Sequence, residues 1–165
     1  MDSARVVLRE YGIWDELTPF RDRRQGLARW ALTAAQPSHG PIPDRYPLKE
    51  LPGADYPERT RRNVEDSGAT LILHRGPLSA GTLLTLQICE ELLKPVCLID
   101  AAEVTAEEGA GIARDFIDAH DIHRLNVAGP RASHWAQAHD YARKVIRALL
   151  AISLHENDDA MASSR

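Results

Sequence analysis

The residues best suited to hold a ligand lie in one short segment between a predicted strand and a predicted helix. Glycine stands at both of its ends, and it carries two hydroxyl side chains. Glycine permits close approach of the backbone, and the first N–H groups of a helix have no intrahelical acceptor. Such N–H groups, with the helix dipole, attract phosphate and other anions. The pattern predicts an anion-binding loop made of Gly76, Pro77, Leu78, Ser79, Ala80, Gly81 and Thr82.

A second loop of similar character follows a later predicted strand and comprises Asn126, Gly129, Pro130, Arg131 and Ser133. An arginine at this position is able to make a bidentate bond to phosphate or carboxylate. The alternative interpretation is that Arg131 is exposed to solvent and that Ser133 caps the next helix. Neither loop matches the dinucleotide-binding fingerprint or the P-loop, which has a lysine after its last glycine.

No arrangement of residues typical of nucleophilic or acid–base catalysis is evident. His74, His134 and His139 fall near the presumed ligand edge, where a histidine more often contacts a ligand or solvent than acts as a base. Cys89 and Cys97 are eight residues apart, with no histidine at metal-ligand spacing. We expect two reduced core thiols and no metal site.

The bulk composition excludes some classes of function. The chain has 165 residues and a formal net charge of −4, so it has no basic field for non-specific nucleic-acid binding. No apolar run approaches the length of about 18 residues that spans a membrane, and the first residues lack the apolar core of a secretory signal. We therefore expect a cytoplasmic protein that binds a small anionic ligand and neither nucleic acid nor membrane.

The elements that must position these loops alternate in type. Short apolar runs at 69–73, 96–99 and 124–127 predict buried strands. Helical patterns lie between and after them, at about 57–65, 82–93, 105–117 and 133–154, with a capping box of Thr105 and Glu108. This order predicts an α/β fold with a mainly parallel sheet covered on both faces, a Rossmann-like three-layer α/β/α arrangement. All loops that follow strands then meet at one edge, where open α/β sheets bind ligands.

The outer parts of the chain are harder to assign. A short strand is expected at 5–8, and residues 21–34 have helix-favouring composition. Residues 36–57 hold many prolines, so we predict a loop packed on the body of the protein. We expect a single domain over 1–155 and a disordered tail over 156–165. The predicted packed faces consist of Leu84, Ile88, Leu92, Cys89 and Leu93 in one helix and of Ile112, Ala113, Phe116 and Ile117 in the next.

Several motifs in order resemble a known family. They are GPIPDRYPLKE at 40–50, ADY at 54–56, RT at 59–60, NV at 63–64, DS at 66–67, GPLSAGT at 76–82, KP at 94–95 and LNVAGPRAS at 125–133. This succession is similar to that of the molybdenum carrier family, relatives of the molybdenum cofactor carrier proteins in the lysine-decarboxylase-like Rossmann group. The resemblance covers about residues 40–150.

The resemblance implies a Rossmann-like fold, a homodimer or homotetramer, and a phosphorylated ligand: the molybdenum cofactor (molybdopterin) or a nucleotide-like molecule. It implies that both loops bind this ligand, that molybdoenzymes are partners, and that Arg59 and Asn63 belong to a binding motif in the helix before the central strand. One feature departs from the family. The Gly-Gly-Gln-Thr-Gly-x-Asp-like loop usual after the first strand is missing, so residues 1–35 are divergent and part of the expected anion site is absent.

The related phosphoribohydrolases carry a glutamate three residues after the glycine–threonine pair of their loop. Here Thr82 is followed by Leu83, Leu84 and Thr85, and the first acidic residues of the helix come two turns later. This favours a non-catalytic carrier over the first alternative, an enzyme that cleaves nucleoside monophosphates. The second alternative, motivated by the missing loop, is a degenerate member with a structural or partner-binding role.

Overall fold

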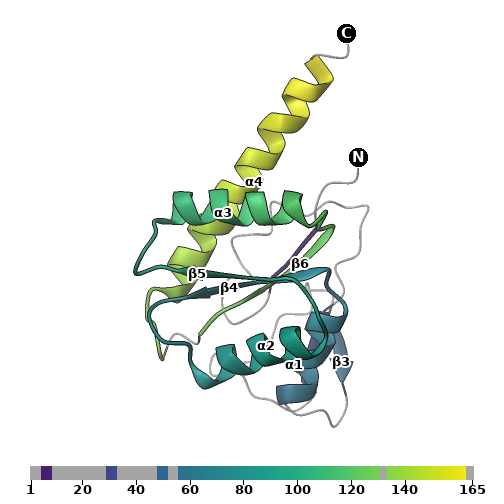
Figure 1. The fold of residues 1–165 in the computed structure, drawn as a ribbon, viewed down its shortest axis with the longest axis vertical. Coiled ribbons are helices and arrows are strands. Elements are labelled where there is room, and N and C mark those ends of the chain that lie inside the picture. The colour runs from purple at the N-terminus through teal and green to yellow at the C-terminus, as the bar shows by residue number, and fades with distance from the viewer. Residues whose placement is uncertain (1–4, 9–28, 33–47, 52–55, 131–132, 163–165) are drawn as a thin grey trace.

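The structure, a computed structural model, describes the backbone of residues 5–8, 29–32, 48–51, 56–130 and 133–162, and the side chains of 57–130 and 133–151. The elements in these residues (Figure 1) are β1 (Arg5–Leu8), β2 (Arg29–Leu32), β3 (Leu48–Leu51), α1 (Tyr56–Glu65), β4 (Ala69–His74), α2 (Ala80–Glu91), β5 (Val96–Asp100), α3 (Ala106–Ala119), β6 (Arg124–Ala128) and α4 (Ala138–Ala162).

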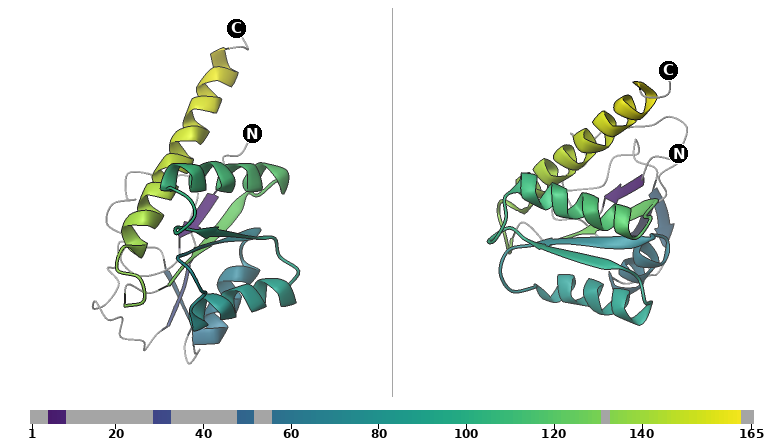
Figure 2. Two further views of the ribbon diagram at one scale, coloured as in Figure 1. Left: turned by 60° about the vertical axis from the view of Figure 1, so that its left-hand side comes forward. Right: turned by 45° about the horizontal axis from the view of Figure 1, so that its top comes forward.

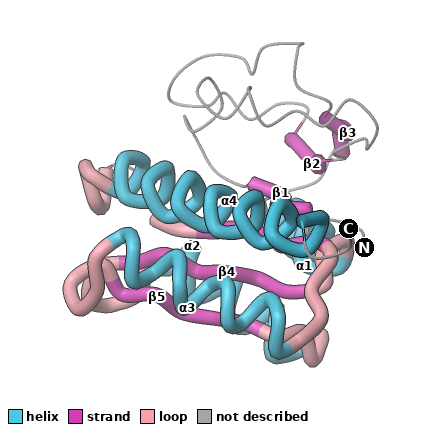
Figure 3. The backbone as a smooth tube through the Cα atoms, turned by 90° about the horizontal axis from the view of Figure 1, so that it is seen from above, coloured by secondary structure: helices cyan, strands magenta, loops and turns pink. Residues whose placement is uncertain are grey.

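The main sheet contains four parallel strands in the order β1-β6-β4-β5, and β2 and β3 form a separate parallel pair. In the centre, Leu71 of β4 lies opposite Val127 on one side and Cys97 on the other. Helices α3 and α4 cover one face, and α1 and α2 cover the opposite face (Figure 1). Seen from above, α3 and α4 lie side by side over the sheet (Figure 3). The predicted Rossmann-like α/β fold is confirmed.

The larger core lies between the sheet and the pair α3 and α4. Alternate residues of the central strands point into it, including Leu71, Leu73, Leu125 and Val127, because side chains of a strand alternate between the two faces of a sheet. The close approach of α3 to α4 depends on small residues: a Cβ added to Gly109 would stand 3.1 Å from the hydroxyl oxygen of Tyr141. This packing leaves Ile112, expected in the packed face, 42% exposed.

The smaller core lies between the sheet and the pair α1 and α2. Ile88 and Cys89 of α2 are buried there, with Leu84 and Leu92 packed against them, which confirms most of the predicted stripe. Leu93 is wrong, since it is 91% exposed. It stands just beyond the helix with φ of 51°, and this left-handed turn directs the side chain into solvent.

Local signals end and begin several of these helices as expected. The predicted capping box of α3 is present, because the Thr105 side chain accepts from the Glu108 N–H while the Glu108 carboxylate accepts from the Thr105 N–H. Helix α2 ends in a Schellman motif, in which Leu93 N–H donates to the carbonyl of Glu90 at 3.1 Å and Lys94 N–H to that of Cys89 at 2.9 Å.

Two predictions for the N-terminal third need correction. The expected helix at 21–34 contains β2 instead, and the expected proline-rich loop at 36–57 contains β3 and the start of α1. β2 and β3 pair with each other over Arg29–Leu48 to Leu32–Leu51. Pairing between segments far apart in the sequence overrides a weak helix propensity, and short-range patterns do not report it.

The last helix also differs from its predicted bounds. Residues 133–137 form turns, and α4 begins at Ala138, whose N–H donates to the carbonyl of Trp135 at 3.0 Å. It continues to Ala162 and projects beyond the sheet (Figure 2). The expected disordered tail therefore begins as helix, in keeping with the helix-forming Ala and Met in this part of the chain. No helix of the described residues is long and apolar enough to cross a membrane.

Candidate functional site

The carboxyl ends of the three strands β4, β5 and β6 meet at one edge of the sheet. They end at His74, Asp100 and Ala128. β4 and β6 are neighbours, but the helix after β4 packs on one face and the helix after β6 packs on the other (Figure 2). This is a topological switch point, where open α/β sheets form the crevice that binds ligands. The two loops predicted from the sequence flank this point.

The two loops approach each other closely. β6 pairs with β4 up to Ala128, which lies opposite Ile72. The next residue, Gly129, has its Cα so near β4 that an added Cβ would stand 2.9 Å from the carbonyl oxygen of Leu73. A side chain there requires the backbone to shift, so the glycine is needed for packing. The structure thus brings the start of the second loop against the end of β4.

The first half of the first loop is held by β5. Gly76 adopts φ of 66°, and its N–H donates to Oδ1 of Asp100 at 3.0 Å. The same oxygen accepts from the N–H of Ala102 at 2.8 Å. These two N–H groups, Ala102 first, hold the pKa of Asp100 below its ordinary value. Asp100 was not among the residues singled out from the sequence, although an acidic residue directly after a buried strand is a signal for this edge.

The second half of the first loop forms the start of α2. Ser79 is the N-cap residue, and Ala80, Gly81 and Thr82 make the first turn. The Ser79 hydroxyl makes no capping bond and instead lies 2.7 Å from the Thr82 hydroxyl. The first intrahelical bond runs from Leu83 N–H to the carbonyl of Ser79, so the N–H groups of residues 80–82 have no acceptor within the helix. These groups are the anion-attracting part of the loop. Pro77 is exposed and Leu78 half-buried.

Asn126 lies inside the sheet, two residues before the end of β6. It is fully buried, and its Nδ2 donates to the hydroxyl of Thr70 at 3.2 Å. Its neighbours Leu125 and Val127 point toward α3 and α4, so Asn126 points toward the α1 and α2 side. The structure therefore separates Asn126 from the loop residues, because it is part of the polar packing beneath the edge.

The remaining residues of the second loop are only partly placed. Pro130 is half-buried, and Ser133 is exposed, with its hydroxyl 3.2 Å from Nδ1 of His134. Arg131 lies outside the described residues. The cap role considered for Ser133 is not observed, since α4 begins at Ala138.

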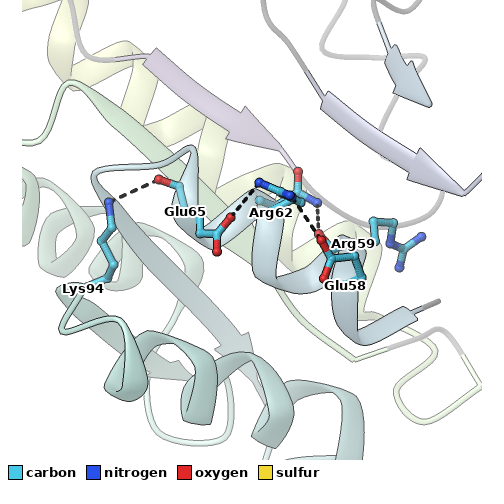
Figure 4. A network of polar contacts seen from close by, with 6 residues as sticks. Glu58, Arg59, Arg62, Glu65 and Lys94 are labelled. Atoms are coloured by element: carbon cyan, nitrogen blue, oxygen red, sulfur yellow. Dashed lines mark hydrogen bonds and ion pairs between the residues drawn. The ribbon is translucent and has the colours of Figure 1, made fainter. Parts of the chain in front are cut away.

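Helix α1 lies beside α2 with its C-terminal end at the opposite edge of the sheet. There, Nζ of Lys94 donates to the carbonyls of Glu65 at 3.3 Å and Ser67 at 2.7 Å. The first turn of α1 is therefore directed toward the carboxyl edge. Arg62 forms surface pairs with Glu58 and Glu65 (Figure 4).

The two α1 residues of the predicted binding motif differ in their surroundings. The Arg59 side chain extends away from the Arg62 pairs (Figure 4). The amide of Asn63 donates to the carbonyl of Arg59 at 3.0 Å, and this residue is 3% exposed. Asn63 therefore stabilises its own helix, whereas Arg59 stands nearer the candidate edge.

Two further observations concern chemistry at the site. Among the described residues, no group of three or more His, Cys, Asp or Glu side chains is placed to hold a metal ion. Cys89 and Cys97 are free cysteines, and burial raises the pKa of both thiols. The structure thus provides backbone N–H groups and hydroxyls for an anion, with Asp100 committed to the loop itself.

The family model described as "Circularly permutated YpsA SLOG family" matches residues 25–150. This match covers both candidate loops and all strands of the main sheet except β1. The chain belongs to the circularly permuted YpsA SLOG family. The match begins after the divergent N-terminal segment.

A solved structure agrees with this family assignment. The crystal structure at 1.45 Å resolution of a protein from Syntrophus aciditrophicus, named "Putative molybdenum carrier protein", is 32% identical in sequence. The likeness covers 74% of this chain and 78% of that chain, with a TM-score of 0.71. The resemblance to molybdenum carrier proteins is thereby confirmed for this SLOG chain. A comparison with curated proteins gives no match.

Proposed function

We propose that this chain is a non-catalytic binding or carrier protein for the molybdenum cofactor or a similar phosphorylated pterin or nucleotide. The observation that carries the proposal is the first turn of α2 at the switch point. There, the N–H groups of residues 80–82 lack intrahelical acceptors, and Gly129 brings the second loop against β4. Family membership and the name of the structural neighbour support a molybdenum-related cargo.

The residues present suit a phosphate group. N–H donors at a helix start take up phosphate oxygens, and the helix dipole favours their charge. Thr82 is buried beside this turn, 2.7 Å from the Ser79 hydroxyl, so either hydroxyl is able to turn its proton toward an anion. Arg131 is proposed as the cation of the second loop. We further propose that the chain forms a homodimer or homotetramer and delivers its cargo to molybdoenzymes.

The position of the acidic residues argues against the enzymatic alternative. The helix positions just after Thr82 hold Leu83, Leu84 and Thr85. Glu90 is eight residues beyond Thr82, about 12 Å along the helix axis. Glu91 forms an ion pair with Arg61 of α1. A carboxylate that could take part in cleaving a glycosidic bond is therefore absent from this turn of α2.

The test is calorimetric titration of the purified chain with molybdate, tungstate and adenosine monophosphate. The variant Ala80→Asp places a carboxylate at the exposed first position of α2, which suits the helix itself but repels an anion. Gln87→Glu makes the same charge change two turns away on the exposed side of α2. We expect Ala80→Asp to lower affinity about tenfold or more, in keeping with a charge effect near 1.4 kcal/mol, and Gln87→Glu to leave it within about twofold.

The outcomes separate the alternatives. Equal affinities of both variants for a probe that binds would exclude this turn as the site. Release of adenine from the monophosphate would favour the enzyme. Absence of heat with every probe, in a protein that unfolds cooperatively, would favour a structural role.

A further inference from the structure

His74 ends the central strand β4 in an unusual setting. Its ring atom Nδ1 lies 2.8 Å from the carbonyl oxygen of Gly76 and 3.8 Å from Oδ2 of Asp100. The side chain is 14% exposed. Leu73 points into the core on the α3 and α4 side, so His74 lies on the side of α2. The histidine and the first turn of α2 are thus on the same face of the sheet, at the same edge.

The partners of Nδ1 determine where the imidazole proton is. A carbonyl oxygen only accepts hydrogen bonds, so the 2.8 Å contact requires a proton on Nδ1. The Asp100 carboxylate on the other side of the ring nitrogen favours the same arrangement. A neutral imidazole with its proton on Nδ1 has a lone pair on Nε2. Within the described part of the chain, no hydrogen bond or ion pair reaches Nε2.

The ring is held by a closed set of bonds. The carbonyl that accepts from Nδ1 belongs to Gly76, whose own N–H donates to Oδ1 of Asp100 at 3.0 Å. The backbone carbonyl of His74 accepts from Ala101 N–H at 2.7 Å, and Ala102 N–H donates to Asp100 at 2.8 Å. This network joins the ends of β4 and β5 and fixes both the tautomer and the direction of the ring. Histidines that present one nitrogen to a ligand are typically oriented in this way through the other.

We propose that His74 is a specificity-determining contact of the candidate site, and that its Nε2 accepts a hydrogen bond from an N–H or O–H group of the ligand. This inference rests on the proposed binding function. The start of α2 supplies only donors, which suit anionic oxygens, whereas Nε2 is an acceptor at the same edge. A bare oxyanion satisfies the first and leaves the second unpaired. The preferred ligand therefore carries a hydrogen-bond donor near its anionic group, as a hydroxylated or ring-bearing phosphate ester does.

Two substitutions separate the two nitrogens of the ring. In His74→Asn the amide nitrogen occupies the approximate place of Nδ1 and keeps the bond to Gly76, while nothing replaces Nε2. In His74→Gln the longer side chain returns an acceptor near the place of Nε2 but gives up the Gly76 bond. Both variants and the wild type are titrated at pH 8 with molybdate and with adenosine monophosphate, and their thermal unfolding midpoints are compared.

We expect His74→Asn to bind adenosine monophosphate about fivefold more weakly, the size of one neutral hydrogen bond, and to bind molybdate as the wild type does. We expect His74→Gln to recover part of the lost affinity. Long-range ¹⁵N–¹H correlation spectra of the free wild type at pH 8 should place the imidazole proton on Nδ1.

A proton on Nε2 would overturn the inference without any ligand, and so would equal affinity of wild type and His74→Asn for the monophosphate. Either result leaves the proposed function intact if the wild type binds. A wild type that binds no probe removes the proposed function, and this inference with it.

Discussion

The carboxylate of Asp100 and the backbone N–H of Gly76 are joined by a hydrogen bond of 3.0 Å between two neighbouring strand ends. The first glycine of the candidate loop therefore donates to the protein itself. The positive φ of Gly76 is part of this arrangement, and the anion-attracting donors are confined to residues 80–82. The loop divides into a fixed half next to β5 and an open half at the start of α2.

This relationship predicts how acid affects the structure. The N–H groups of Ala102 and Gly76 lower the pKa of Asp100 in the folded protein, so its stabilising effect is present above the unfolded value of about 3.9. It is lost as the pH falls through the lower folded value. We expect Asp100→Asn to lower the thermal unfolding midpoint at pH 7 and to have a much smaller effect at pH 2.

The measurement is thermal unfolding of both proteins from pH 7 to pH 2. The control is Asp115→Asn on the exposed side of α3, which should show no such convergence. A difference between wild type and Asp100→Asn that stays constant over the whole range would show that the carboxylate charge is not what holds the loop.

Glycine at the junction of the loops gives a second prediction. A methyl group at residue 129 would stand 2.9 Å from the carbonyl oxygen of Leu73, whereas nothing lies within 4 Å of a methyl group at Gly111 of α3. Gly129→Ala should cost about 1–3 kcal/mol of unfolding free energy, as overpacking does. Gly111→Ala should add about 0.5–1 kcal/mol, because alanine loses less entropy in a helix. Urea unfolding of the two variants tests this, and equal effects would refute the close contact.

The parts of the fold that were predictable are those with local signals. β4 is an uninterrupted apolar run, and α3 begins at a capping box formed within four residues. β2 and β3 were missed because their evidence is their pairing with each other across some twenty residues. In the site, the glycines announced the loops, but the role of Asp100 depends on β5 lying next to β4. A single sequence contains no direct sign of that adjacency.

Lys94 provides a third prediction, at the edge of the sheet away from the site. Its Nζ donates to the carbonyls of Glu65 and Ser67, which follow or end α1 (Figure 4). A cation at this position stabilises the end of a helix, and removing it leaves two carbonyls without this donor. Lys94→Met should cost about 1–2 kcal/mol of unfolding free energy. Lys144→Met, at an exposed position of α4, is the matched control and should be nearly neutral in the same denaturant titration.

The end of α2 gives the last prediction. Leu93 is in the left-handed region with φ of 51° and 91% exposure, at the position of a Schellman motif where glycine is most common. The left-handed conformation costs a non-glycine residue about 1–2 kcal/mol, and glycine gives back part of this gain through its greater flexibility when unfolded. Leu93→Gly should therefore raise the unfolding free energy by about 0.5–1 kcal/mol.

Two comparisons show whether the backbone or the exposed leucine is responsible. Leu93→Ala removes the apolar side chain but keeps the strained φ, so it should bring little gain. Asp121 ends α3 with φ of 50° in the same motif, and aspartate tolerates this region better than leucine because its short polar side chain bonds locally. Asp121→Gly should gain less than Leu93→Gly in chemical denaturation. If Leu93→Ala stabilises the protein as much as Leu93→Gly does, the gain comes from the side chain, and backbone strain at the end of α2 is negligible.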